Sequence, residues 1–156
     1  MRAVSDTSPL GYLVLIGQTD LAPRLFTAVV IPQAVRLELA SPRAPVEIQQ
    51  WVRDPPPWLS VDSGPLRSST GLDRLHDGER AAILLAEQLG ADVVLLDEKA
   101  GRAIARARGL QVSGLLGILR VAASRGLVDL PTAVEALLRV GFRASPALLR
   151  SLLETG

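Results

Sequence analysis

The stretch Val93-Val94-Leu95-Leu96-Asp97 decides the fold class of this chain of 156 residues. Four consecutive apolar residues that end at an acid are typical of a strand buried on both faces of a parallel sheet. A helical pattern of apolar residues over 78–89 precedes the run and ends at Gly90, and a second helical pattern follows from Asp97 to Ala107. A helix, a buried strand and another helix in succession predict an α/β unit with a right-handed crossover.

The same alternation extends toward both ends of the chain. Short strands are predicted at 3–5, 29–31 and 110–112, where apolar and β-branched residues cluster. Ser8-Pro9 is predicted to cap a helix that ends near Ile16, and further helices are predicted at 32–40, 115–123, 131–140 and 146–153. Residues 42–65 hold six prolines and predict an irregular connection around a short helix. We therefore expect one domain over 1–156, with a parallel sheet covered on both faces and C-terminal helices from about 131 to 154.

Composition excludes several classes of site. The chain has no cysteine, which excludes disulfides, thiolate zinc sites and a cysteine nucleophile, and its one histidine, His76, excludes multi-histidine metal sites. Seventeen basic against sixteen acidic residues give a net charge of +1, which neither predicts nor excludes nucleic-acid binding. No stretch approaches the roughly 20 apolar residues of a membrane span, so we expect a cytoplasmic protein with no membrane partner.

Four acidic residues are predicted to meet at one edge of the sheet. Asp6 and Asp97 directly follow two predicted strands, and parallel strands bring their carboxyl ends together. Glu38 and Glu79 each share a helix face with apolar residues, which places them beside the buried stripe of their helices. Because converging carboxylates repel one another, a hard, oxygen-ligated ion such as Mg²⁺ or Mn²⁺ would be needed to neutralise them.

Each acid also has an ordinary structural explanation. Asp6 and Asp97 could cap the helices that follow them. Glu38 could be a solvated helix residue, and Glu79 could lie in a first turn that the helix dipole favours. The hypothesis of a site therefore depends on the four residues jointly, and His76 is interpreted as a turn or surface residue.

Beyond these residues, several blocks of the chain resemble the PIN-domain nucleases, and among them the branch that begins with Asp-Thr-Ser-Pro-Leu and is related to the VapC-type toxins. The similarity covers about Val4 to Leu153, and the order and spacing of its blocks are specific together. The blocks are Asp6-Thr7-Ser8-Pro9-Leu10, the segment 30–38, His76-Asp77-Gly78-Glu79 with the helix after it, Leu96-Asp97-Glu98-Lys99, the segment 112–119 and Gly141-Phe142-Arg143.

This resemblance implies a three-layer α/β/α fold and a Mg²⁺- or Mn²⁺-dependent endonuclease that hydrolyses phosphodiester bonds of single-stranded RNA. By position, the catalytic and metal-binding acids would be Asp6, Glu38, Glu79 and Asp97, with Ser8 supporting the first of them. Many small PIN proteins are toxins of toxin–antitoxin pairs. The partners implied are therefore RNA, an antitoxin protein and a second copy of the chain in a homodimer.

Arginines near the last acid are candidates for substrate binding. Arg102 lies just over one helical turn beyond Asp97, where it could neutralise the acids or hold a phosphate through two hydrogen bonds. Arg106 follows one turn later, and with Arg108 it would form a basic strip along an RNA backbone, unless the strip is only a solvated helix face. The apolar residues of 137–153 predict either core or a homodimer contact.

Two other classes of protein remain as alternatives. One is a non-catalytic module that keeps the fold and binds nucleic acid or protein, against which the presence of all four acids speaks. The other is a flavodoxin-like or receiver-like domain. It is disfavoured because Asp6 has no acidic neighbour, Lys99 lies immediately past Asp97, and no glycine-rich phosphate loop is present.

Overall fold

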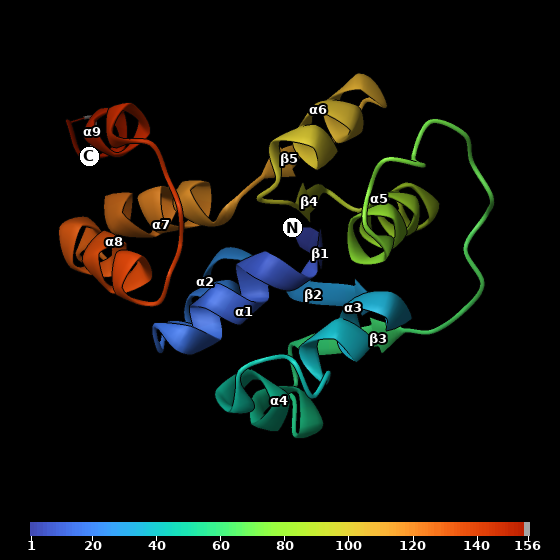
Figure 1. Ribbon diagram of the computed structural model, residues 1–156, viewed down its shortest axis with the longest axis horizontal. Helices are drawn as coiled ribbons and strands as arrows, with labels where there is room; N and C mark the ends of the chain where they lie inside the picture. Colours follow the sequence, from blue (N-terminus) through green and yellow to red (C-terminus); the bar gives the residue numbers. More distant parts are fainter. Residues whose placement is uncertain (155–156) are drawn as a thin grey trace.

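The computed structural model describes residues 1–154 of the chain. A parallel sheet of five strands forms the centre, in the order β3-β2-β1-β4-β5 (Figure 1). The strands are β1 (Arg2–Ser5), β2 (Ala28–Pro32), β3 (Leu59–Asp62), β4 (Val93–Leu95) and β5 (Val112–Ser113). The predicted α/β class with a parallel sheet is confirmed.

Helices cover both faces of this sheet (Figure 1). They are α1 (Thr7–Leu15), α2 (Leu21–Leu25), α3 (Gln33–Leu39), α4 (Val46–Arg53), α5 (Asp77–Leu89), α6 (Lys99–Ala107), α7 (Leu115–Ser124), α8 (Leu130–Arg139) and α9 (Pro146–Glu154). Successive strand residues point to opposite faces. Ala3 and Val29 therefore pack with apolar side chains of α1 to α4, whereas Val4 and Val30 pack with those of α5 and α6, which gives three layers.

The C-terminal helices form a separate apolar cluster against α1 and α2. Leu137 and Leu152 are buried in it, whereas Leu138, Leu148 and Leu153 remain 41–50% exposed. The apolar residues of 137–153 thus divide into a part that is core and a part that is open to solvent.

Three local predictions were wrong. The strand predicted at 110–112 lies at Val112–Ser113, where it pairs with β4. The segment 42–65 was predicted to be irregular apart from a short helix, but it contains β3. This strand gives little signal in the sequence because it lies at the edge of the sheet, pairs with β2 alone and buries only Leu59 fully. Helix α1 begins at Thr7 rather than after a Ser8 cap, because the chain leaves β1 at Ser5 and Asp6 takes the N-cap position. Strand pairing, rather than local sequence preference, decides these boundaries.

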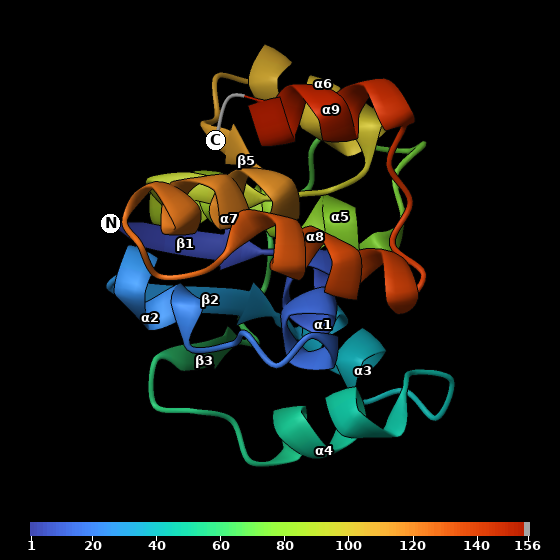
Figure 2. The same cartoon turned by 90° about the vertical axis from the view of Figure 1, so that its left-hand side faces the viewer.

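The direction of the chain across the sheet reverses between β1 and β4. From β1 the chain moves outward through β2 and β3, then returns to β4 on the other side of β1 and continues to β5. The carboxyl ends of these strands all point the same way, and α1 and α3 begin at that edge (Figure 2). Ligands of open α/β sheets bind at such a switch point. No helix of residues 1–154 is long and apolar enough to cross a membrane.

Candidate active site

Two aspartates lie at the switch point. Asp6 follows β1, is 6% exposed and has its backbone N–H bonded to the Leu95 carbonyl of β4 at 3.0 Å. Asp97 lies just beyond β4, and its Oδ1 accepts a hydrogen bond of 2.8 Å from the N–H of Leu115 at the start of α7. Neither side chain caps the helix that follows it, since Asp6 makes no capping bond and α6 has Glu98 at its N-cap. The capping explanation is therefore wrong for both residues.

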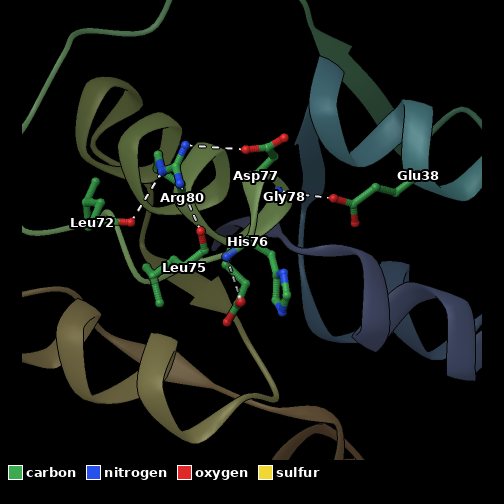
Figure 3. Close-up of polar contacts among 8 residues, drawn as sticks. Glu38, Leu72, Leu75, His76, Asp77, Gly78 and Arg80 are labelled. Atoms are coloured by element: carbon green, nitrogen blue, oxygen red, sulfur yellow. Dashed lines mark hydrogen bonds and ion pairs between the residues drawn. The ribbon is translucent and has the colours of Figure 1, made fainter.

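Glu38 reaches the same place from α3. Its Oε2 accepts a hydrogen bond from the Thr7 hydroxyl, and its Oε1 accepts one of 3.1 Å from the N–H of Gly78 (Figure 3). A Cβ atom at Gly78 would lie 2.7 Å from Glu38 Oε1 and 2.8 Å from Asp6 Oδ1. The two carboxylates therefore converge on a point at the start of α5 where only glycine fits.

Glu79 is the next residue of α5 and is 4% exposed. Its Oε1 accepts the N–H of His76 at 3.3 Å, while its Oε2 is buried without a hydrogen-bond partner. Arg80 fixes the turn that precedes this helix, because its guanidinium donates to the carbonyls of Leu72 at 3.3 Å and Leu75 at 2.9 Å (Figure 3). The start of α5 is thereby held where it presents Glu79 to the interior.

Burial dominates the electrostatics of Asp6. It raises the pKa of this carboxyl from 3.8 to about 7, against a backbone hydrogen bond from Thr7 that lowers it. The charges of Glu38, Glu79 and Asp97, in that order, also contribute to this rise to about 7. All four predicted acids are therefore close enough to interact through their charges.

Asp97 has the same character. Burial raises its pKa most, the Leu115 N–H and the charge of Arg102 lower it, and the charge of Glu98 raises it. The second oxygen, Oδ2, is buried and has no hydrogen-bond partner. Within residues 1–154, Asp97 Oδ2 and Glu79 Oε2 are the two buried side-chain nitrogen or oxygen atoms that have no hydrogen-bond partner.

Two adjoining pockets open beside the acids. The first, of 290 Å³, is lined by Asp6, Thr7, Ser8, Glu38, His76, Glu79 and Glu98. The second, of 390 Å³, is lined by Ser8, Tyr12, Asp97, Glu98, Gly141, Phe142 and Arg143. Ser8 and Glu98 line both pockets. Three of the predicted acids therefore line the first pocket, and the fourth, Asp97, lines the adjoining second pocket.

The other predicted residues lie at varying distances from this centre. Ser8 lines both pockets but makes no side-chain hydrogen bond among residues 1–154, and the contact with Asp6 comes from Thr7 instead. Arg102 acts on the charge of Asp97, whereas Arg106 is exposed in the last turn of α6 and lines neither pocket. Arg108 is paired with Glu87 at 2.7 Å, which interrupts the proposed basic strip. Phosphate binding by Arg102 and Arg106 stays a prediction.

Several further residues shape the site and were not predicted from the sequence. Thr7 orients Glu38, Gly78 makes room for two carboxylates, and Glu98 adds a fifth acid to the pockets. A glycine in the first turn of a helix, directly before a buried acid, was the signal available for Gly78. Nothing local indicated Thr7, because its partner is 31 residues away.

The carboxylates suit a hard divalent cation chemically, although residues 1–154 contain no preformed set of three acidic or histidine ligands. Glu38 is held by Thr7 and Gly78, and Asp97 is held by Leu115, so these side chains are not drawn onto one point. Two buried oxygens without partners next to a desolvated aspartate are nevertheless costly unless a cation is bound. All donors are oxygens, which Mg²⁺ and Mn²⁺ prefer.

Comparisons with known proteins agree with this fold. A family model described as a PIN domain matches residues 2–155. Among solved structures, a PilT N-terminus domain protein from the hyperthermophilic archaeon Sulfolobus solfataricus P2 is similar with a TM-score of 0.51 and 15% identity, over 86% of this chain and 95% of that one. At this identity the likeness shows the fold alone, and no curated protein matches the chain. With a three-layer α/β/α fold and a match along almost its whole length, the chain belongs to the PIN domain family, a family of nuclease-type hydrolases.

Proposed function

We propose that this protein is a Mg²⁺- or Mn²⁺-dependent endoribonuclease that hydrolyses phosphodiester bonds of single-stranded RNA. The observation that carries the proposal is the pair of buried, unpartnered oxygens on Glu79 and Asp97 beside Asp6, whose pKa is raised to about 7. A fold without a bound cation gains nothing from keeping these groups buried, because each costs desolvation energy.

The four acids would have different roles in binding metal ions and orienting water. Asp6 and Asp97 would hold the principal ion at the switch point, while Glu38 and Glu79 would hold a second ion or orient the attacking water. A bound divalent ion supplies a Lewis acid for the scissile phosphate and lowers the pKa of a coordinated water. The chain itself fixes the acids beforehand, since Thr7 and Gly78 orient Glu38 and the Leu115 N–H orients Asp97.

The direct test is cleavage of an end-labelled single-stranded RNA of mixed sequence by the purified protein. We expect internal cleavage with Mn²⁺ or Mg²⁺, none with EDTA, and none when the same sequence is supplied as DNA. Failure to cleave a varied RNA panel, together with no Mn²⁺ binding by calorimetry, would reject the proposal in favour of a non-catalytic module that keeps the fold.

Replacing Gly78 with alanine is expected to weaken Mn²⁺ binding by at least about tenfold, which corresponds to roughly 1.4 kcal/mol. The added methyl group would lie within 2.9 Å of three carboxylate oxygens of Asp6 and Glu38 and would force them apart. Alanine otherwise favours a helix over glycine by about 1 kcal/mol, so the protein should still fold. Calorimetric titration with Mn²⁺ measures the change.

The neighbouring substitution Asp77→Ala is the matched control, because the Asp77 side chain is 84% exposed in the same turn. It should bind Mn²⁺ as the wild type does. Equal affinities for the two variants and the wild type would mean that the carboxylates beside Gly78 do not take part in Mn²⁺ binding.

Partners follow from the same proposal. The substrate would be RNA in the cytoplasm. An antitoxin protein would act on this site if the chain is the toxin of a pair. A homodimer would cover the exposed Leu138, Leu148 and Leu153.

Sedimentation equilibrium of the wild type and of Leu148→Asp tests the homodimer, which only the wild type should form. A monomeric wild type would reject it.

A further inference from the structure

The second pocket, which contains Asp97 but not the other three acids, is also lined by a basic residue. Arg143 is the one arginine or lysine lining either of the two pockets of residues 1–154. It is exposed, and no hydrogen bond or ion pair engages its side chain in this described part of the chain. Acids that could have neutralised it, Asp97 and Glu98, line the same pocket without pairing with it.

The backbone before Arg143 is held by a hydrogen bond and a ring contact. Helix α8 is followed by Gly141 in a left-handed conformation with φ +94°, and the N–H of Phe142 then bonds back to the Leu137 carbonyl at 3.0 Å. The Phe142 ring packs edge-on against Tyr12 of α1, with centroids 5.1 Å apart and an interplanar angle of 89°. The C-terminal region is thereby fastened to the helix that carries Ser8, next to the acids.

We propose that Arg143 binds a backbone phosphate of the substrate strand, one that neighbours the phosphate at the acids. This inference rests on the proposed nuclease function and assigns the second pocket as a subsite for the adjoining nucleotide. The two pockets share Ser8 and Glu98, so a strand that lies over the first continues into the second. The five carboxylates of the two pockets repel the negatively charged RNA strand. The guanidinium of Arg143 provides an attractive contact for one of its phosphates.

Arg102 is placed differently. Its charge acts on Asp97, but its side chain lines neither of the two pockets. Arg143 has no such partner, and arginines that bind phosphate do so through charge-assisted hydrogen bonds.

The test measures RNA affinity separately from cleavage. Asp6→Asn protein in Mn²⁺ is titrated against a fluorescein-labelled single-stranded RNA by anisotropy over a range of salt concentrations, with and without Arg143→Gln. We expect the second substitution to weaken binding about tenfold, as for one charge-assisted hydrogen bond, and to reduce the slope of log affinity against log salt by about 0.7, as for one lost phosphate contact.

The matched control is Arg125→Gln. Arg125 is also exposed, but it lines a hollow with Met1 and Val93, at the amino ends of the strands and thus at the opposite edge of the sheet. It should change neither the affinity nor the slope. Thermal unfolding of both variants should match the parent, since neither side chain is buried.

A neutral linkage locates the contact. Each RNA of a set carries one uncharged methylphosphonate at a different linkage. At a single linkage, this change should remove the difference in RNA affinity between the parent and Arg143→Gln, because the phosphate charge that Arg143 binds is absent. If every position leaves the difference intact, the inference is wrong.

The outcomes separate this inference from the proposed function. Wild-type cleavage with an RNA affinity that Arg143→Gln leaves unchanged would overturn the inference alone. Absence of both cleavage and RNA binding would overturn both proposals. Arg143-dependent binding without wild-type cleavage would keep the phosphate contact and overturn the nuclease.

Discussion

Asp6→Asn is expected to abolish metal-dependent RNA cleavage, with a loss of at least about a hundredfold in rate, the lower bound for removing a group that stabilises transition-state charge. The substitution keeps the shape of the side chain but removes the negative charge at the centre of the acidic set. Because Asp6 interacts with Glu38, Glu79 and Asp97 together, no neighbouring carboxylate occupies an equivalent position. Single-turnover cleavage of labelled RNA in Mn²⁺ measures the effect.

Asp62→Asn is the matched control for this prediction. Asp62 also lies at the carboxyl end of a strand, but on the edge strand β3, where its Oδ1 accepts the N–H of Gly64 at 3.0 Å. Cleavage by this variant should equal that of the wild type. If Asp6→Asn folds and still cleaves at the wild-type rate, the acids at the switch point are not the catalytic centre.

The second large effect is expected on stability. In EDTA, the free energy of unfolding should fall by about 3 kcal/mol between pH 5 and pH 8, since one pKa unit corresponds to about 1.4 kcal/mol. The pKa of Asp6 is about 7 in the folded protein and 3.8 when unperturbed, so the folded state holds this proton over a range in which the unfolded chain releases it. Stability is therefore lost as the pH rises through that range, and the raised pKa of Asp97 acts in the same direction.

Urea unfolding at several pH values checks this sign. Asp6→Asn should flatten the dependence and, at pH 8 in EDTA, should be more stable than the wild type. Mn²⁺ at pH 8 should stabilise the wild type and not the variant, because binding to the folded state alone adds stability. A wild type whose stability increases from pH 5 to pH 8 in EDTA would contradict the burial of an uncompensated Asp6.

Much of the architecture was predictable because it depends on sequence patterns within short segments. The apolar run Val93–Leu96 and the helical spacing of 78–89 depend on neighbours within a few residues, and both elements were placed correctly. The edge strand Leu59–Asp62 was missed, since its backbone pairs with β2 although its side chains are mostly exposed. Edge strands carry little hydrophobic signal because only one face and one side are covered.

For the candidate site, the sequence determined which chemical groups are present. Asp6 and Asp97 follow strands, and parallel strands bring such residues to one edge, so their proximity followed from topology alone. The residues that orient the acids could not be inferred, because Thr7 meets Glu38 and Leu115 meets Asp97 only after distant segments pack.

The sequence by itself thus determined the fold class, the parallel sheet and the identity of four acids, because strand and helix periodicity act over short distances. Only the tertiary structure decided that Asp6 and Glu38 converge over Gly78, that oxygens of Glu79 and Asp97 are buried without partners, and that Arg143 lines a pocket with Asp97. Burial and charge interactions depend on which segments meet in space, and segments separated by tens of residues meet only when the core packs.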